Sequence, residues 1–283
     1  MTLLRRCRNY GRRITPMRFD MASIALMLAV VLLPGAPTPA TNDATNISRP
    51  SKVRSTAVPA ALESTHKRIV VVDAGHNGAN RLHSKEIDQM VDAGGFLKAC
   101  NTVGTSGLSG LSEAAYNWAV ATRLESILRR DGWIVVLTRS DNNGWGPCVD
   151  RRGLTAGRVG AVALLSIHAD GAPATGHGFH VIYPAARSGV TATTASSSSD
   201  LAVAVRDAMV NAGFAPSTYI GRNGLNQRSD LGTLNRSSSP SMMIESGNMR
   251  NPADDAILSS GQEQLHIAQA IAAGFESWST ARR

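Results

Sequence analysis

The sequence contains few aromatic residues, few cysteines and no long apolar run. Phe, Trp and Tyr make up 5% of the 283 residues, yet 43% of all residues are hydrophobic. That share is large enough to build a core, and it excludes a wholly disordered chain. The longest apolar run, residues 21–33, is too short to cross a bilayer comfortably. The length fits one large domain or two small ones.

A strong excess of positive charge is also missing from most of the chain. The formal net charge is +8, but residues 1–40 contain six arginines and one aspartate. The remaining residues include 23 basic and 20 acidic side chains, a net charge of +3. A nucleic-acid-binding protein keeps a basic excess in its folded part. We therefore predict no nucleic-acid partner.

The first 40 residues have the features of a secretory signal peptide. An arginine-rich start precedes the apolar run, Pro34 ends that run, and small residues follow at 38–40. We predict a signal peptide at 1–40, with an uncleaved membrane anchor as the alternative. The mature protein is then secreted, periplasmic or located in the cell wall, without stable membrane insertion. Residues 41–67, rich in Thr, Ser, Ala and Pro, predict a disordered linker.

One pair of cysteines remains after the predicted cleavage. Cys7 lies in the signal peptide, which leaves Cys100 and Cys148. An even pair in an exported protein favours a disulfide. Closing a loop of that length stabilises a fold by about 4 kcal/mol in the chain-entropy model. Two free, buried thiols are the alternative.

Short apolar runs alternate with helical patterns between residues 68 and 280. Strands are expected near 68–73, 133–138, 161–167, 178–183, 231–234 and 241–245, and helices near 112–130, 151–158, 200–211 and 260–278. This alternation predicts a single α/β domain with a twisted, mostly parallel (mixed) sheet of about six strands and helices on both faces. The Gly-rich stretch 75–110 predicts a long loop, and such loops often line sites. Without a heptad pattern, a monomer is expected.

Four side chains lie where they could form one metal site. His76, His168 and Glu245 each follow a short apolar run that predicts a buried strand, and Glu113 opens a long helical pattern. In open α/β sheets, ligands bind outside the carboxyl ends of the strands. Two imidazoles and two carboxylates brought there suit a zinc hydrolase, in which three side chains bind Zn²⁺ and one carboxylate is the base.

Each of these residues also has a purely structural interpretation when it is taken alone. A loop histidine such as His76 is a surface residue at least as often as a ligand. Glu113 suits the first turn of a helix because it opposes the macrodipole, and His168 could be a hydrogen-bonded core histidine. A carboxylate at the end of a buried strand is costly unless it is paired. Glu245 therefore requires a metal or an arginine nearby.

Five segments add a more specific signal because they follow one another in a fixed order. They lie at 69–76, 111–117, 136–139, 166–170 and 240–245, with Asn-Pro-Ala-Asp at 251–254 after them. Together they resemble the catalytic domain of type 3, zinc-dependent N-acetylmuramoyl-L-alanine amidases, over residues 68–280. The resemblance implies that His76, Glu113 and His168 bind zinc and that Glu245 is the catalytic carboxylate.

The same resemblance implies a substrate, peptidoglycan or its muropeptide fragments, and a role in cell-wall remodelling as an autolysin. The bond cleaved would be the amide between N-acetylmuramic acid and L-alanine. Arg139, Asn117 and Asp170 lie in the matching segments and are the predicted substrate contacts. Arg139 could bind stem-peptide carboxylates, although surface pairing explains most arginines equally well. The family often has Asn at the position of Asp170, so local contacts differ here.

Two other functions fit the same four residues. A zinc carboxypeptidase or endopeptidase would use identical metal chemistry on the stem peptide itself. A non-catalytic, peptidoglycan-binding regulator would keep the fold but lose a ligand or the base. All four residues are present in this chain, which favours an enzyme.

Overall fold

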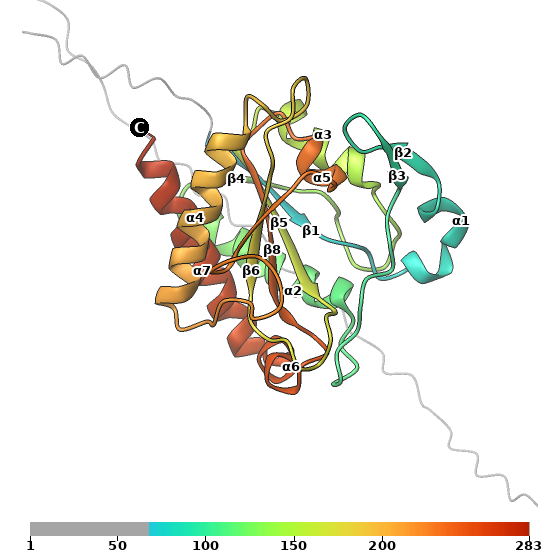
Figure 1. The fold of residues 1–283 in the computed structure, drawn as a ribbon, viewed down its shortest axis with the longest axis vertical. Helices are drawn as coiled ribbons and strands as arrows, with labels where there is room; N and C mark the ends of the chain where they lie inside the picture. The colour runs from blue at the N-terminus through green and yellow to red at the C-terminus, as the bar shows by residue number, and fades with distance from the viewer. Residues whose placement is uncertain (1–67, 283) are drawn as a thin grey trace, which may run out of the picture. The chain divides into compact units, whose positions relative to one another are not determined.

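Six strands form the central sheet, in the order β4-β1-β5-β8-β6-β7 (Figure 1). The computed structural model describes residues 68–282, and the predicted signal peptide and linker lie outside them. The strands are β1 (Ile69–Ala74), β4 (Ile134–Leu137), β5 (Ala163–Asp170), β6 (His180–Pro184), β7 (Leu225–Arg228) and β8 (Ser241–Asn248). The four strands β4, β1, β5 and β8 are parallel, β6 runs antiparallel to β8, and β7 is parallel to β6. The predicted mixed, mostly parallel sheet in a single α/β domain is confirmed.

Helices cover both faces of this sheet, as predicted. The helical elements are η1 (Asn80–Leu82), α1 (Ser84–Ile87), α2 (Glu113–Arg130), α3 (Val149–Val159), α4 (Ala195–Asn211), α5 (Gly232–Asn235), α6 (Pro252–Ser259) and α7 (Gly261–Thr280). Helices α2 and α4 pack on one face, α7 packs against both of them, and α3 and α5 contact the other face (Figure 1). Within residues 68–282, no helix combines the length and apolarity needed to span a membrane.

The main core lies between the sheet and the layer formed by α2, α4 and α7. Val72, Leu124 and Phe275 are fully buried in it. Strand β1 is apolar on both of its faces, because a parallel sheet covered by helices on each side leaves neither face to water. Helix α2 starts where predicted, since the Ser112 hydroxyl accepts a hydrogen bond from the Ala115 N–H.

The sequence interpretation was wrong at two places in the second half of the chain. Leu231 is the extended N-cap of the short helix α5, and residues 232–234 belong to that helix. The strand in this region is β7, a few residues earlier. The Ser/Thr-rich segment predicted as a loop at 191–199 already belongs to α4 from Ala195 onward. Ala195 and Ser198 are buried there, so packing overrides the weak helix propensity of a serine run.

The stretch 75–110 is more ordered than predicted. It contains η1, α1 and an antiparallel hairpin formed by β2 (Met90–Asp92) and β3 (Leu97–Ala99). The turn of this hairpin is closed by Asp92 Oδ1, which accepts hydrogen bonds from the N–H groups of Gly94 and Gly95. Strands of three residues are too short to produce a recognisable period in the sequence. The predicted loop therefore contains a structured hairpin between residues 90 and 99.

Cys100 and Cys148 form the predicted disulfide. Cys100 directly follows β3, and Cys148 is the N-cap of α3. The adjacent Val149 N–H also donates a hydrogen bond to the Cys100 carbonyl at 2.7 Å. The disulfide thus ties the hairpin to a helix that packs on the sheet.

Replacing both cysteines with serine should lower the free energy of unfolding by about 4 kcal/mol, because the unfolded chain regains the freedom of a loop of 48 residues. Urea denaturation of the oxidised wild type and of the double variant measures this loss. Reduced wild type should behave like the variant, and reductant should leave the variant unchanged. Equal midpoints for oxidised wild type and variant would contradict the prediction.

Candidate active site

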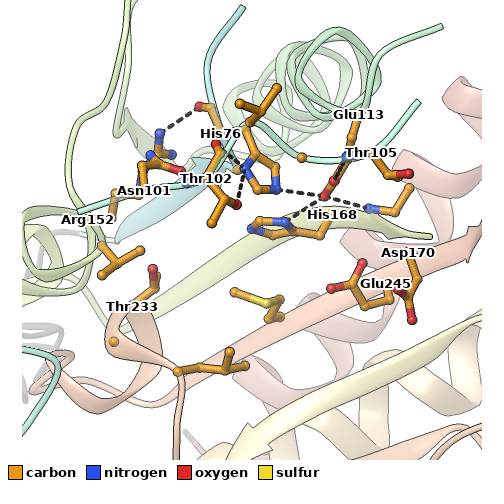
Figure 2. Close-up of a pocket in the computed structure, with 18 of the residues that line it drawn as sticks. His76, Asn101, Thr102, Thr105, Glu113, Arg152, His168, Asp170, Thr233 and Glu245 are labelled. Carbon is orange, nitrogen blue, oxygen red and sulfur yellow. Dashed lines mark hydrogen bonds and ion pairs between the residues drawn. The ribbon is translucent and has the colours of Figure 1, made fainter. Parts of the chain in front are cut away.

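The three predicted metal ligands come together in the folded chain, as Figure 2 shows. Glu113 Oε1 lies 3.0 Å from His76 Nε2 and 2.9 Å from His168 Nδ1. One potential ligand atom from each residue lies within 4.8 Å of the other two. Donor atoms around a tetrahedral zinc ion with bonds of about 2.0–2.1 Å are separated by about 3.3 Å. Two imidazoles and a carboxylate at this spacing fit such an ion with little rearrangement.

Glycines beside these ligands leave room for them. A Cβ on Gly75 would lie 2.2 Å from the imidazole of His168, and a Cβ on Gly104 would lie 2.8 Å from Glu113 Oε2. His76 itself has a left-handed backbone, with φ +55°, which is unusual for a residue other than glycine. In the turn after β1, Gly75 therefore packs closely against the His168 ring, and the next residue, His76, has a strained backbone.

The loop after the hairpin orients two of the ligands. The Nδ1 of His76 lies 2.9 Å from the Thr102 carbonyl, which can only accept, so Nδ1 is the donor and Nε2 faces Glu113. The N–H of Thr105 donates to Glu113 Oε2 at 2.9 Å. Hydrogen bonds of this kind fix the tautomer and orientation of metal ligands. Loop 101–105 therefore fixes the orientation of the His76 and Glu113 side chains.

Glu245 lies beside His168 on the neighbouring strand. The two residues are register partners between β5 and β8, and Glu245 is also the partner of His180 on β6. Both strands continue past these residues, so His168 and Glu245 lie within their strands. The sequence had placed His168 just after its strand and Glu245 at the end of its strand. The site therefore lies on one face of the sheet, near the carboxyl ends of β5 and β8.

Two carboxylates of the site have pKa values that move in opposite directions. Burial would raise the pKa of Glu113, but the adjacent imidazoles of His76 and His168 hold that pKa well below its usual range. Burial and the negative charges of Glu113 and Asp170 raise the pKa of Glu245 well above its usual range, and Arg228 only partly offsets them. Such divergence separates a permanently anionic ligand from a carboxyl that can exchange a proton.

Glu245 is not the salt-bridged carboxylate that the sequence left open as an alternative. Among residues 68–282 it forms no ion pair, and its Oε2 atom is buried without a hydrogen-bond partner. An unpaired buried carboxylate oxygen is costly. A free oxygen of this kind, next to three potential metal ligands, is suited to hold a proton or a water molecule.

The three predicted substrate contacts lie in different places. Asp170 lines the cavity next to Glu245 (Figure 2). Arg139 and Asn117 are buried behind the turn that follows β1 and carries His76, and they do not line the cavity. Arg139 donates to the carbonyls of Ala74 and Ala114, and Asn117 donates to the carbonyl of Gly75. The role of all three as substrate contacts stays a prediction.

Arg152 is almost fully buried and contacts the turn that carries His76. Its Nη1 lies 2.7 Å from Asp73 Oδ1, and its Nη2 donates to the His76 carbonyl at 2.7 Å. Burial alone would raise the pKa of Asp73. Arg152 and the hydroxyls of Ser166 and Thr138 outweigh burial and bring this pKa down to about 2. The sequence signal for this ion pair is a carboxylate inside an apolar strand, which requires a buried cation.

The cavity in front of these residues has a volume of about 460 Å³. Its lining combines polar groups, among them the three predicted metal ligands, with apolar side chains that include Val149, Leu231 and Met243. Size and lining are typical of a small-molecule or peptide site. The cavity can therefore bind a substrate so that its reacting bond lies next to both a metal ion and a carboxyl group that accepts protons.

Comparison with known proteins gives consistent matches. A family model described as N-acetylmuramoyl-L-alanine amidase (Amidase_3) matches residues 70–277. The N-acetylmuramoyl-L-alanine amidase Rv3717 of Mycobacterium tuberculosis is 40% identical over 207 residues, which cover 73% of this chain and 84% of that protein.

Solved structures match over the same region. The amidase Ami1 from Mycobacterium smegmatis has a TM-score of 0.71 and 38% identity, covering 75% of this chain and 97% of that one. Ami1 from Mycobacterium abscessus, in its apo form, has a TM-score of 0.68 and 38% identity, covering 75% of this chain and 98% of that one.

Proposed function

The chain belongs to the N-acetylmuramoyl-L-alanine amidase family and is a peptidoglycan amidase, and from this premise we propose how it works. His76, Glu113 and His168 bind one zinc ion, and Glu245 is the general base and then the general acid. The convergence of three ligand atoms beside a carboxyl in register with His168 carries this proposal. The bond cleaved is the amide between N-acetylmuramic acid and L-alanine.

The reaction requires help at both ends of the amide, because an amide is weakly electrophilic and its nitrogen leaves poorly. Zinc bound to the three ligands supplies Lewis acidity, which polarises the carbonyl and makes water more acidic. Glu245 accepts a proton from the attacking water at its unpartnered Oε2, where burial and neighbouring negative charge favour the protonated form. The same carboxyl then donates that proton to the alanine nitrogen as the C–N bond breaks.

We also propose that the enzyme acts outside the cytoplasmic membrane, as an autolysin in cell-wall remodelling. Disulfides are rare in cytosolic proteins and common in exported ones, so the Cys100–Cys148 bond supports export. The predicted signal peptide at 1–40 supports the same location.

Metal analysis combined with mass spectrometry of the products tests the mechanism. We expect about one zinc ion per chain and, from a muramyl dipeptide, release of the intact dipeptide with free N-acetylmuramic acid. Chelation should abolish this release and added Zn²⁺ should restore it, because zinc supplies the Lewis acidity. His168→Gln should lose zinc, whereas His266→Gln, a half-exposed histidine on α7, should keep zinc and rate. Cleavage within the peptide, or full activity after chelation, would contradict the proposal.

A further inference from the structure

Charged side chains of both signs line the cavity. The lining includes the three predicted metal ligands, His76, Glu113 and His168, and the carboxylates of Asp170 and Glu245. Figure 2 shows these two carboxylates on one side of the cavity and Thr233 on the other. A lysine, Lys98 of β3, also lines the cavity. Lys98 brings a positive charge to a site that is otherwise rich in carboxylates.

Lys98 is the cation that can still bind a ligand. Apart from the two histidines, Lys98 and Arg152 are the cationic side chains that line the cavity within residues 68–282. All five N–H groups of Arg152 already donate to acceptors of the protein. A guanidinium in that state supports the fold but has no donor left for a substrate.

The positive charge of Lys98 is not cancelled by its neighbours. Its Nζ donates to the Asp230 carbonyl at 2.9 Å, and the Asp230 carboxylate is 3.7 Å away. That carboxylate is bound in a bidentate pair by Arg228, at 2.8 and 2.6 Å. The three side chains together keep one net positive charge. An ammonium group has three N–H donors, so two remain for a ligand.

The backbone that carries Lys98 is held in place. The disulfide of Cys100 lies two residues further along the chain. At the other end of the hairpin, Arg236 forms an ion pair with Asp92 at 2.8 Å, and the Asn235 amide donates to the Ala93 carbonyl at 2.9 Å. A preorganised cation loses less conformational freedom when it binds an anion.

The chemistry of the proposed substrate identifies which half carries an anion. The carboxyl group of the muramic acid is consumed in the amide that is cleaved, so the sugar half offers hydroxyl and acetamido groups. Free carboxylates occur in the stem peptide, beyond the alanine. We propose that Lys98 binds a stem-peptide carboxylate, so that the peptide half of the substrate lies toward the β2–β3 hairpin. This inference rests on the proposed function, and it makes Lys98 a specificity-determining residue for anionic over amidated stem peptides.

The test compares two substrates that differ in one charge. Muramyl dipeptide carries a free carboxylate on its second residue, and its fully amidated analogue carries none. Lys98→Met should raise KM for the acid about fivefold, the effect of one partly exposed ion pair, with kcat unchanged. KM for the amidated analogue should stay the same. Added salt should reduce the difference, because it screens exposed charges.

Matched variants separate charge from structure. Lys98→Arg keeps the charge and should restore KM for the acid, and Lys85→Met, an exposed lysine on α1, should change nothing. Calorimetric binding of the product dipeptide should weaken in Lys98→Met to the same extent as KM. Equal effects on both substrates, or no effect on either, would overturn the role of Lys98. If the wild type released no dipeptide from either substrate, the proposed function itself would fail.

Discussion

Glu245→Gln should lower kcat by a factor of about 10²–10⁴, the usual contribution of a general acid–base group, while zinc stays bound. Glutamine has the shape of glutamate but cannot accept the proton of the attacking water. Glu113 and the two histidines are untouched, so the zinc content should stay near one per chain. Single-turnover cleavage of muramyl dipeptide and metal analysis of the same sample measure both quantities.

The same variant should be at least as resistant to heat as the wild type. In the wild type, the Glu245 carboxyl is buried next to Glu113 and Asp170, and its Oε2 has no partner. A neutral amide removes that repulsion, so activity and stability should change in opposite directions. Glu263→Gln, on the partly exposed start of α7, is the control and should alter neither. A variant that cleaves at the normal rate would refute the role of Glu245 as base.

Arg152→Met should lower the free energy of unfolding by about 3–5 kcal/mol, because it leaves a buried carboxylate without its cation. Asp73 is fully buried, and Arg152 is its only ion-pair partner within residues 68–282. The loss also frees the His76 carbonyl, so zinc affinity should fall with stability. Chemical denaturation and competition with a chelator measure the two effects.

The destabilisation should depend on pH in a defined direction. In the wild type, the pKa of Asp73 is about 2, below the value of about 3.9 in an unfolded chain. Its ionised form therefore stabilises the fold above pH 3.9, and this contribution is lost as the pH falls toward 2. In Arg152→Met, burial raises the pKa instead, and protonation relieves the cost. The difference between variant and wild type should be largest near pH 7 and shrink in acid.

Arg158→Met provides the control on the same helix. Arg158 is exposed on α3, and its replacement should change stability by less than about 0.5 kcal/mol. Arg152→Lys keeps the charge without the fork of donors and should fall between wild type and Arg152→Met. A loss below about 1 kcal/mol in Arg152→Met would show that the ion pair matters little.

Much of the fold was predictable because its signals are local. The continuous apolar run of β1 and the Ser112 cap before α2 are properties of neighbouring residues, and both are confirmed. The convergence of His76, Glu113 and His168 could be anticipated because parallel strands end at the same edge of a sheet. The positions of the two histidines, within or just after strands, fixed them in space once the strand order was known, and Glu113 is placed by the start of helix α2.

Other features depend on contacts that no local pattern contains. Arg152 and Asp73 are 79 residues apart, and an arginine near a helix start has the same sequence pattern whether it is buried or exposed. Lys98 lies on a strand of three residues, below the length at which alternation is detectable. Its position in the cavity wall follows from the folded hairpin, not from its neighbours in the sequence.

The left-handed backbone at His76 has a consequence for protein engineering. A residue with a Cβ pays about 1–2 kcal/mol to adopt φ +55°, and glycine would relieve that cost. Glycine would also delete an imidazole from the centre of the reaction. Directed evolution for heat tolerance alone would therefore enrich inactive proteins at codon 76, and a library aimed at a hardier enzyme should leave that codon fixed.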